Sequence, residues 1–178
     1  MSTRKYLIGA LAALGVMNSS AAFAQSCIKE TEVKAMTLYA LPTIISAAQS
    51  KCANTLPADG FMATQASQLA ARYEAKKDSN WPTARKVLIA LASQGNGNAD
   101  QRMGQILEQM PPATVKELLD SMLFQKLSEE IKPSKCVMIE HGLEIAAPLE
   151  PDETASIFAF VMTLAAPEKL NICPLDKK

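Results

Sequence analysis

Aromatic residues, histidine and any excess of one charge are scarce in this sequence. Aromatics make up 5% of the 178 residues, there is one His and one Trp, and 18 basic side chains balance 18 acidic ones. Without a basic excess the chain lacks the positive surface that binds phosphate backbones, so we expect no nucleic-acid partner. The low aromatic content also argues against the stacking platforms that bind single-stranded nucleic acids.

The motifs of the common enzyme classes are missing as well. The sequence has no Gly-x-Ser-x-Gly, no His-Glu-x-x-His and no Gly-x-x-x-x-Gly-Lys. Residues 26–29 match Ser-x-x-Lys by letter, but the Ser-Asp-Asn and Lys-Thr-Gly motifs that accompany it in penicillin-interacting enzymes are absent. We therefore expect a protein that is not an enzyme and assign it no catalytic residue, no cofactor and no metal ligand.

Long apolar runs are limited to the N-terminus. Arg4 and Lys5 precede an eleven-residue apolar run over residues 6–16, and Ala22-Phe23-Ala24 follows it. The run is shorter than the roughly 20 residues that span a bilayer, and the pattern is typical of a bacterial signal peptide cleaved after residue 24. A lipoprotein signal fits less well, because Gln25 stands where a small residue is required before Cys27. We expect an exported, periplasmic or secreted chain with no membrane insertion after cleavage.

The remaining residues, 25–178, are enough for one domain with a substantial core. Their apolar residues recur at three- and four-residue steps, and no segment shows convincing two-residue alternation. The sequence therefore predicts a single all-α domain, a compact bundle of six to seven short amphipathic helices held by disulfides.

Prolines and capping residues set the expected helix boundaries in the first half. A helix over residues 29–50 contains Pro42, which either kinks it or breaks it into two. A second helix should run from residue 62 to about 77. Residues 78–80 would then cap a third helix that has Pro82 in its first turn, with Trp81 packed over the core.

The second half predicts helices near residues 98–110, 112–131, 137–146 and 152–165. The first, second and last of these have apolar residues that we expect to face the core. In the first of these the inward residues would be Met103, Ile106, Leu107 and Met110. In the second they would be Val115, Leu118, Leu119, Met122, Leu123, Leu127 and Ile131. In the last they would be Ile157, Phe158, Val161 and Leu164.

The four cysteines, Cys27, Cys52, Cys136 and Cys173, predict two disulfides, because an exported protein meets an oxidising compartment. We weakly favour Cys27 with Cys52 and Cys136 with Cys173. An unbroken helix between Cys27 and Cys52 would hold them about 35 Å apart. The favoured pairing therefore requires the chain to reverse at Pro42, and otherwise both cysteines must pair with the C-terminal ones.

These observations favour a binding protein over a catalyst. The leading hypothesis is an interaction module whose amphipathic helices hold a protein partner, with another protein of the cell envelope as the candidate. The first alternative is a carrier with a cavity between helices for a small apolar ligand. The second is a small enzyme that uses His141 with Glu140 or Glu144 as the neighbouring carboxylate.

Overall fold

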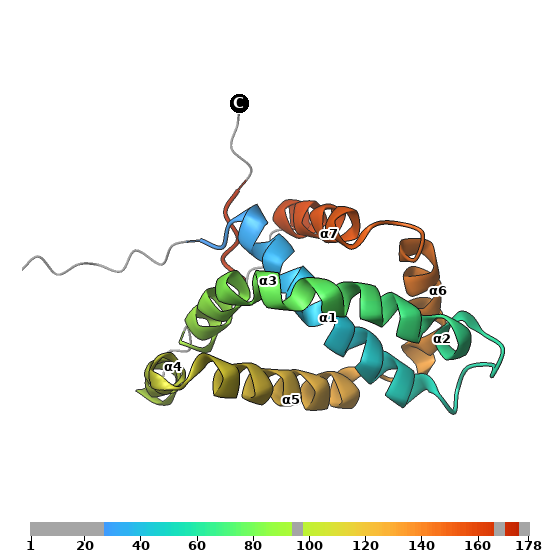
Figure 1. The fold of residues 1–178 in the computed structure, drawn as a ribbon, viewed down its shortest axis with the longest axis horizontal. Coiled ribbons are helices and arrows are strands. Elements are labelled where there is room, and N and C mark those ends of the chain that lie inside the picture. The colour runs from blue at the N-terminus through green and yellow to red at the C-terminus, as the bar shows by residue number, and fades with distance from the viewer. Residues whose placement is uncertain (1–26, 94–97, 166–169, 175–178) are drawn as a thin grey trace, which may run out of the picture.

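Seven α-helices and one short 3₁₀ helix form the part of the chain that the structure, a computed structural model, describes: residues 27–93, 98–165 and 170–174 (Figure 1). The predicted signal peptide, residues 1–24, lies outside these residues. The helices are α1 (Glu30–Cys52), α2 (Phe61–Thr64), α3 (Ala66–Ala92), α4 (Asn98–Gln109), α5 (Pro112–Glu130), η1 (Pro133–Lys135), α6 (Cys136–Ala146) and α7 (Pro151–Ala165). The predicted all-α bundle with disulfides is confirmed.

Helix α1 is the central element of the bundle. It packs against α3, α5, α6 and α7, and Figure 1 shows α7 on one side of it and α5 on the other. Leu38, Ile45 and Ala48 of α1 join Phe61, Leu69 and Tyr73 in the largest cluster of buried residues. None of the helices in the described residues is both long and apolar enough to cross a bilayer.

Helix α1 continues through Pro42 and is not broken there. Proline has no N–H and leaves one helical carbonyl without its usual donor, so an interior proline weakens a helix. Pro42 is buried, and the Ser46 hydroxyl one turn later donates to the Pro42 carbonyl at 2.9 Å. Packing on both sides of α1 therefore holds the helix together across a residue that would weaken it in isolation.

The predicted break between residues 77 and 81 is wrong. Helix α3 runs without interruption from Ala66 to Ala92 and contains Pro82. Ser79 and Asn80, expected to cap a new helix, instead donate back to the Lys76 carbonyl at 2.9 and 2.8 Å. The contact between α1 and α3 is the most extensive in the bundle, and this packing outweighs the local preference of the capping residues.

The favoured disulfide pairing is also wrong. Cys27 bonds to Cys173, and Cys52 bonds to Cys136. Because α1 is a single helix of 23 residues, its ends lie about 34 Å apart, which excludes a bond between Cys27 and Cys52. The alternative, in which both N-terminal cysteines pair with the C-terminal part of the chain, is the one that the structure adopts.

A short pairing of extended chain accompanies the Cys27–Cys173 bond. The Ile28 N–H donates to the Asn171 carbonyl at 2.8 Å, and the Cys173 N–H donates to the Ile28 carbonyl at 2.9 Å. Ile28 and Ile172 are both buried in a second cluster with Val33, Val87 and Ala159. The segment after α7 is thereby fixed to the start of α1.

We predict that the two disulfides differ in resistance to reduction. The side chains of Cys52 and Cys136 have no exposed surface, whereas Cys27 and Cys173 are half-buried. Thiol–disulfide exchange requires access to a sulfur, so a mild reductant should open Cys27–Cys173 first while the helices remain folded. Differential alkylation followed by peptide mapping measures the order. Reduction of Cys52–Cys136 at the same rate or earlier would contradict it.

Candidate functional site

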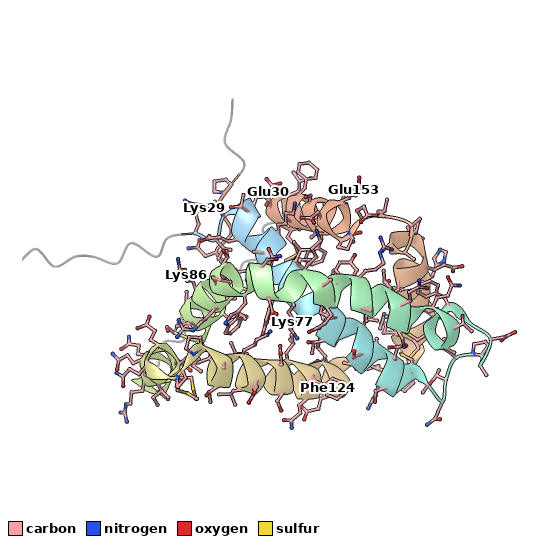
Figure 2. All side chains as sticks on the ribbon, in the orientation of Figure 1. Lys29, Glu30, Lys77, Lys86, Phe124 and Glu153 are labelled. Atoms are coloured by element: carbon pink, nitrogen blue, oxygen red, sulfur yellow. A yellow bond between two sulfur atoms is a disulfide. The ribbon has the colours of Figure 1, made fainter. Side chains whose placement is uncertain are left out.

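Helix α7 carries large apolar side chains on the side that faces away from the bundle. Its outer face consists of five residues that are 45–60% exposed: Ile157, Phe158, Phe160, Val161 and Leu164. After Pro151, the residues that α7 buries are small, namely Ala155, Ala159 and Thr163. At 100° per residue, positions 157, 161 and 164 lie roughly opposite these buried positions, and position 160 lies at the edge of the same stripe. Figure 2 shows side chains that project from α7 away from α1.

This orientation reverses the sequence-based prediction, in which Ile157, Phe158, Val161 and Leu164 faced the core. The inner face of α7 packs along α1, and Ala155 and Ala159 are fully buried there. Small side chains let two helix axes approach closely, and the larger ones then have no room in the contact. The physical reason for the reversal is therefore steric, because the narrow side of α7 fits against α1.

Charged side chains hold the N-terminal end of α7 in place. The Asp152 carboxylate lies 2.8 Å from the Lys76 ammonium of α3 and 3.2 Å from the Lys34 ammonium of α1. Hydrogen bonds from Lys76 and then Lys34 hold the pKa of Asp152 below its usual value. Arg72 of α3 donates to the carbonyls of Ala147 and Leu149 in the preceding loop, at 2.6 and 2.7 Å. Toward its C-terminal end, Ala159 of α7 packs in the same cluster as Ile28 and Ile172, next to the Cys27–Cys173 disulfide.

The remainder of α7 has no charge at all. From Thr154 to Ala165 no residue is Asp, Glu, Lys, Arg or His. A helix that is apolar on opposite faces is typical of one that is covered on both sides. Within the described residues, α1 covers the inner face of α7 and no element covers the outer face.

Two other helices also differ from the predicted inward stripes. Met103 and Ile106 of α4 are about half exposed, and of the α4 residues expected to face inward only Leu107 is fully buried. In α5, Val115 is fully buried, whereas Leu118 and Met122 are exposed. Both helices lie at the edge of the bundle and therefore bury less of their apolar surface than a central helix does.

A buried polar cluster connects α1, α3 and α5. The Tyr39 hydroxyl donates to Asp120 Oδ1 at 2.7 Å, and the Lys77 ammonium lies 2.9 Å from Asp120 Oδ2. The same ammonium lies 5.2 Å from the centre of the Tyr39 ring, and Trp81 packs on the Tyr39 ring at 5.0 Å. Lys77 is only 6% exposed, so its charge depends on Asp120 and on Glu74 at 3.7 Å.

Burial dominates the acid–base behaviour of both tyrosines in the described residues. It raises the pKa of Tyr39 far above its usual value, and the hydrogen bond to Asp120 and the Asp120 charge raise it further. Burial also raises the pKa of Tyr73, which Thr154 and Arg72 lower in part. Both hydroxyls therefore remain protonated in the folded protein, and Tyr39 acts as a hydrogen-bond donor.

His141, the candidate base of the enzyme hypothesis, lies on the outer side of α6. Its side chain is 71% exposed, and its Nδ1 is 3.7 Å from Glu144. Glu140 faces the other way and accepts a hydrogen bond from the Met62 N–H at 2.9 Å, which caps α2. In the part of the chain that the structure describes, no three Asp, Glu, His or Cys side chains are grouped as metal ligands. His141 and Glu140 therefore do not form a pair.

Comparison with known proteins yields no relative. No family model, no curated protein and no solved structure matches this chain.

Sequence reasoning missed the residues that matter most here. Phe160 was not assigned to either face of its helix, and Tyr39, Lys77 and Asp120 were not singled out. The signal for the cluster is weak, because a lysine, an aspartate and a tyrosine far apart in the chain suggest nothing until three helices bring them together. The run without charged residues over 154–165 can be read from the sequence, and it indicates a helix that is apolar on both faces.

We predict that Asp120 stabilises the fold by pairing with buried Lys77. Asp120→Ala should lower the free energy of unfolding by about 2 to 4 kcal/mol, because it leaves a buried ammonium poorly paired and Tyr39 without an acceptor. Asp78→Ala is the matched control: Asp78 also pairs with a lysine, Lys116, but is 89% exposed, so we expect little change. Urea unfolding measures both variants.

A third variant tests whether the stability lost in Asp120→Ala comes from the loss of the ion pair with Lys77. Lys77→Met in the Asp120→Ala background should restore part of the lost stability, because it removes the unpaired charge. The interpretation is wrong if Asp120→Ala costs no more than Asp78→Ala.

We also predict cooperative ionisation of tyrosine at alkaline pH. Tyr6 belongs to the predicted signal peptide, so a chain that begins at residue 25 contains two tyrosines, Tyr39 and Tyr73, both with a raised pKa. Above about pH 10 the unfolded chain loses these protons and the folded chain keeps them, so stability falls as pH rises. Tyrosinate absorbance should therefore appear together with the loss of helical circular dichroism. Tyrosinate formation in a fully helical protein would contradict this.

Proposed function

We propose that this protein is an exported, disulfide-bonded interaction module that binds another protein of the cell envelope through the outer face of α7. The observation that carries the proposal is that α7 is apolar on two opposite faces and only one of them is covered by the described chain. The signal-like N-terminus and the two disulfides support export to an oxidising compartment.

The chemistry of the outer face defines the partner. The exposed positions 157, 160, 161 and 164 have the i, i+3, i+4, i+7 spacing of a helix that inserts into an apolar groove. Because no charge occurs between Thr154 and Ala165, the complementary surface must be uncharged. We therefore assign α7 a partner with an apolar groove rather than an acidic or basic one.

The area of the face favours a groove over a second copy of the chain. Five side chains that each leave on the order of 100 Å² uncovered give about 500 Å² for the partner, and a symmetric pair of α7 helices would bury about 1,000 Å² in total. That is the lower limit for a specific interface and far below an obligate homodimer. A groove that surrounds α7 on both sides buries more surface from the same residues.

A lipid surface fits the same face less well. Interfacial helices combine an apolar face with flanking Lys and Arg that contact anionic headgroups. Helix α7 has no Lys or Arg, and its first turn carries Asp152 and Glu153. Figure 2 shows Glu153 at the N-terminal end of α7, where its charge would oppose an anionic membrane.

Site-specific photo-crosslinking in the producing cell tests the proposal. A benzophenone side chain at Val161 should give an adduct with one partner protein, whereas the same group at Ile106, an equally exposed residue of α4, should not. The partner, once purified, should bind the wild-type protein at least tenfold more tightly than the Phe160→Asp variant. Ile106→Asp should retain the affinity, and both variants should unfold like wild type because the side chains are exposed.

Each other result of this experiment contradicts the proposal. An adduct of twice the chain mass would identify a second copy, an adduct only with lipid would identify a membrane surface, and equal adducts at Val161 and Ile106 would show unspecific contact. Export is checked on the same material, whose mass should equal residues 25–178 less four hydrogens.

A further inference from the structure

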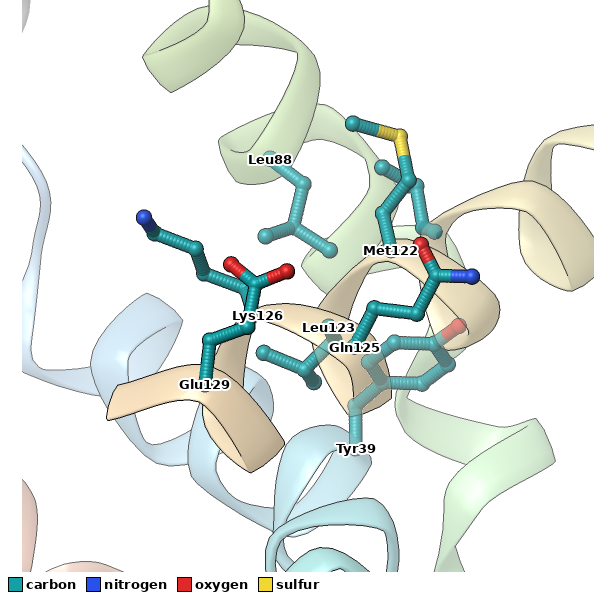
Figure 3. A pocket seen from close by; sticks show the side chains of 8 residues that line it. Tyr39, Leu88, Met122, Leu123, Gln125, Lys126 and Glu129 are labelled. Carbon is teal, nitrogen blue, oxygen red and sulfur yellow. The ribbon is translucent and has the colours of Figure 1, made fainter. Parts of the chain in front are cut away.

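A pocket of about 410 Å³ opens between α1, α3 and α5, away from α7 (Figure 3). Its inner wall is the ring of Tyr39 with Leu88, Leu119 and Leu123, which are buried or half-buried, and Met122 lies at its more exposed edge. Helix α5 packs along α1 and is joined to α3 by the Lys77–Asp120 ion pair and by the packing of Val115 against Ile89. Beside these contacts, Leu88 of α3 and Leu123 of α5 line the space that remains open between the two helices. The volume is within the range of about 300 to 1,000 Å³ that is usual for small-molecule sites.

We infer that this pocket binds a neutral, apolar small molecule. The inference is independent of the interaction proposed for α7, because the two sites share no residue and lie on opposite sides of α1 (Figure 1).

The inner wall offers no free hydrogen-bond donor to a ligand. The Tyr39 hydroxyl is the polar side-chain group of this wall, and its proton is already donated to Asp120. Asp120 in turn is paired with Lys77, so these two charges satisfy one another beside the pocket and not within it. A charged group on this wall would lose its hydration and could gain at most one hydrogen bond, as a donor to the Tyr39 oxygen.

The residues at the rim of the pocket do not favour a ligand of either charge. Lys126 and Glu129 both line it, and the Lys126 ammonium is paired with Glu130 at 3.2 Å. Figure 3 shows Lys126 and Glu129 together at one edge of the pocket, with Gln125 at another. An anionic ligand would meet Glu129 and a cationic one Lys126, whereas a neutral molecule meets neither penalty.

Two naphthalene dyes of the same ring frame test the inference on the exported, oxidised protein. N-phenyl-1-naphthylamine is neutral, and 1-anilinonaphthalene-8-sulfonate differs by one sulfonate. The neutral dye should bind saturably with one site per chain and at least tenfold more tightly than the sulfonate, followed by dye fluorescence. Trp81, the one tryptophan of the chain, packs on Tyr39 and should change its emission with the same concentration dependence.

Variants place the bound dye. Leu123→Trp fills the pocket and should weaken binding at least tenfold. Met122→Asp, at an exposed position that tolerates the change, puts a charge at the edge and should do the same without affecting the fold. Phe160→Asp on α7 is the control for adhesion to exposed apolar surface and should leave binding unchanged.

The inference is overturned by unsaturable binding, by no binding, by equal affinity for both dyes, or by binding that survives both pocket variants. It is also overturned if Phe160→Asp abolishes binding, or if light scattering shows a dimer that Met122→Asp dissociates, since a second copy would then fill the pocket. None of these results bears on the α7 crosslinking experiment, so the two proposals fail separately.

Discussion

The length of α1 is the constraint on which the rest of the structure depends. Its 23 residues run unbroken through Pro42 and separate Cys27 from Cys52 by more than any disulfide can span. Each end of α1 is therefore bonded to a different part of the C-terminal chain, Cys52 to the start of α6 and Cys27 to the segment after α7. Helices α6 and α7 lie between these two bonds in the chain, so together they connect one end of α1 to the other.

This anchoring explains how α7 can present large apolar side chains to solvent. Burial of Ala155, Ala159 and Thr163 gains little hydrophobic free energy compared with burial of phenylalanine or leucine, at about 25 cal/mol for each Å². The Asp152 ion pairs at the start of α7, together with the Cys27–Cys173 bond of the segment that follows it in the chain, add fixation that the small inner face does not provide. The large residues thus remain on the outer face, where they form the exposed apolar patch on which the proposed interaction rests.

The fold class and most helix positions could be predicted from the sequence because the three- and four-residue period persists along the chain. Two features could not. Whether a helix continues through an interior proline depends on which elements pack beside it. The sequence around Pro42 and Pro82 shows only that proline destabilises a helix locally, and not the packing that offsets this cost. The prediction of which side of α7 packs against the bundle was wrong because both sides are apolar. Hydrophobicity alone then does not identify the buried side. Residue size does: the smaller residues face the nearer helix.

The two candidate sites have the same origin, because the helices around α1 in the described residues do not cover one another completely. Helix α3 covers α1 along most of its length, α5 contacts both helices but leaves a pocket beside Tyr39, and α7 covers a third side of α1 with its small residues. Among the described residues, the outer face of α7 is left uncovered. The Tyr39–Asp120–Lys77 cluster fixes the middle of α5 to α1 and α3 through a hydrogen bond and an ion pair, in addition to the apolar packing of Val115 against Ile89. A bundle held there by leucines alone would gain free energy by collapsing onto the pocket, since apolar packing has no preferred separation beyond contact.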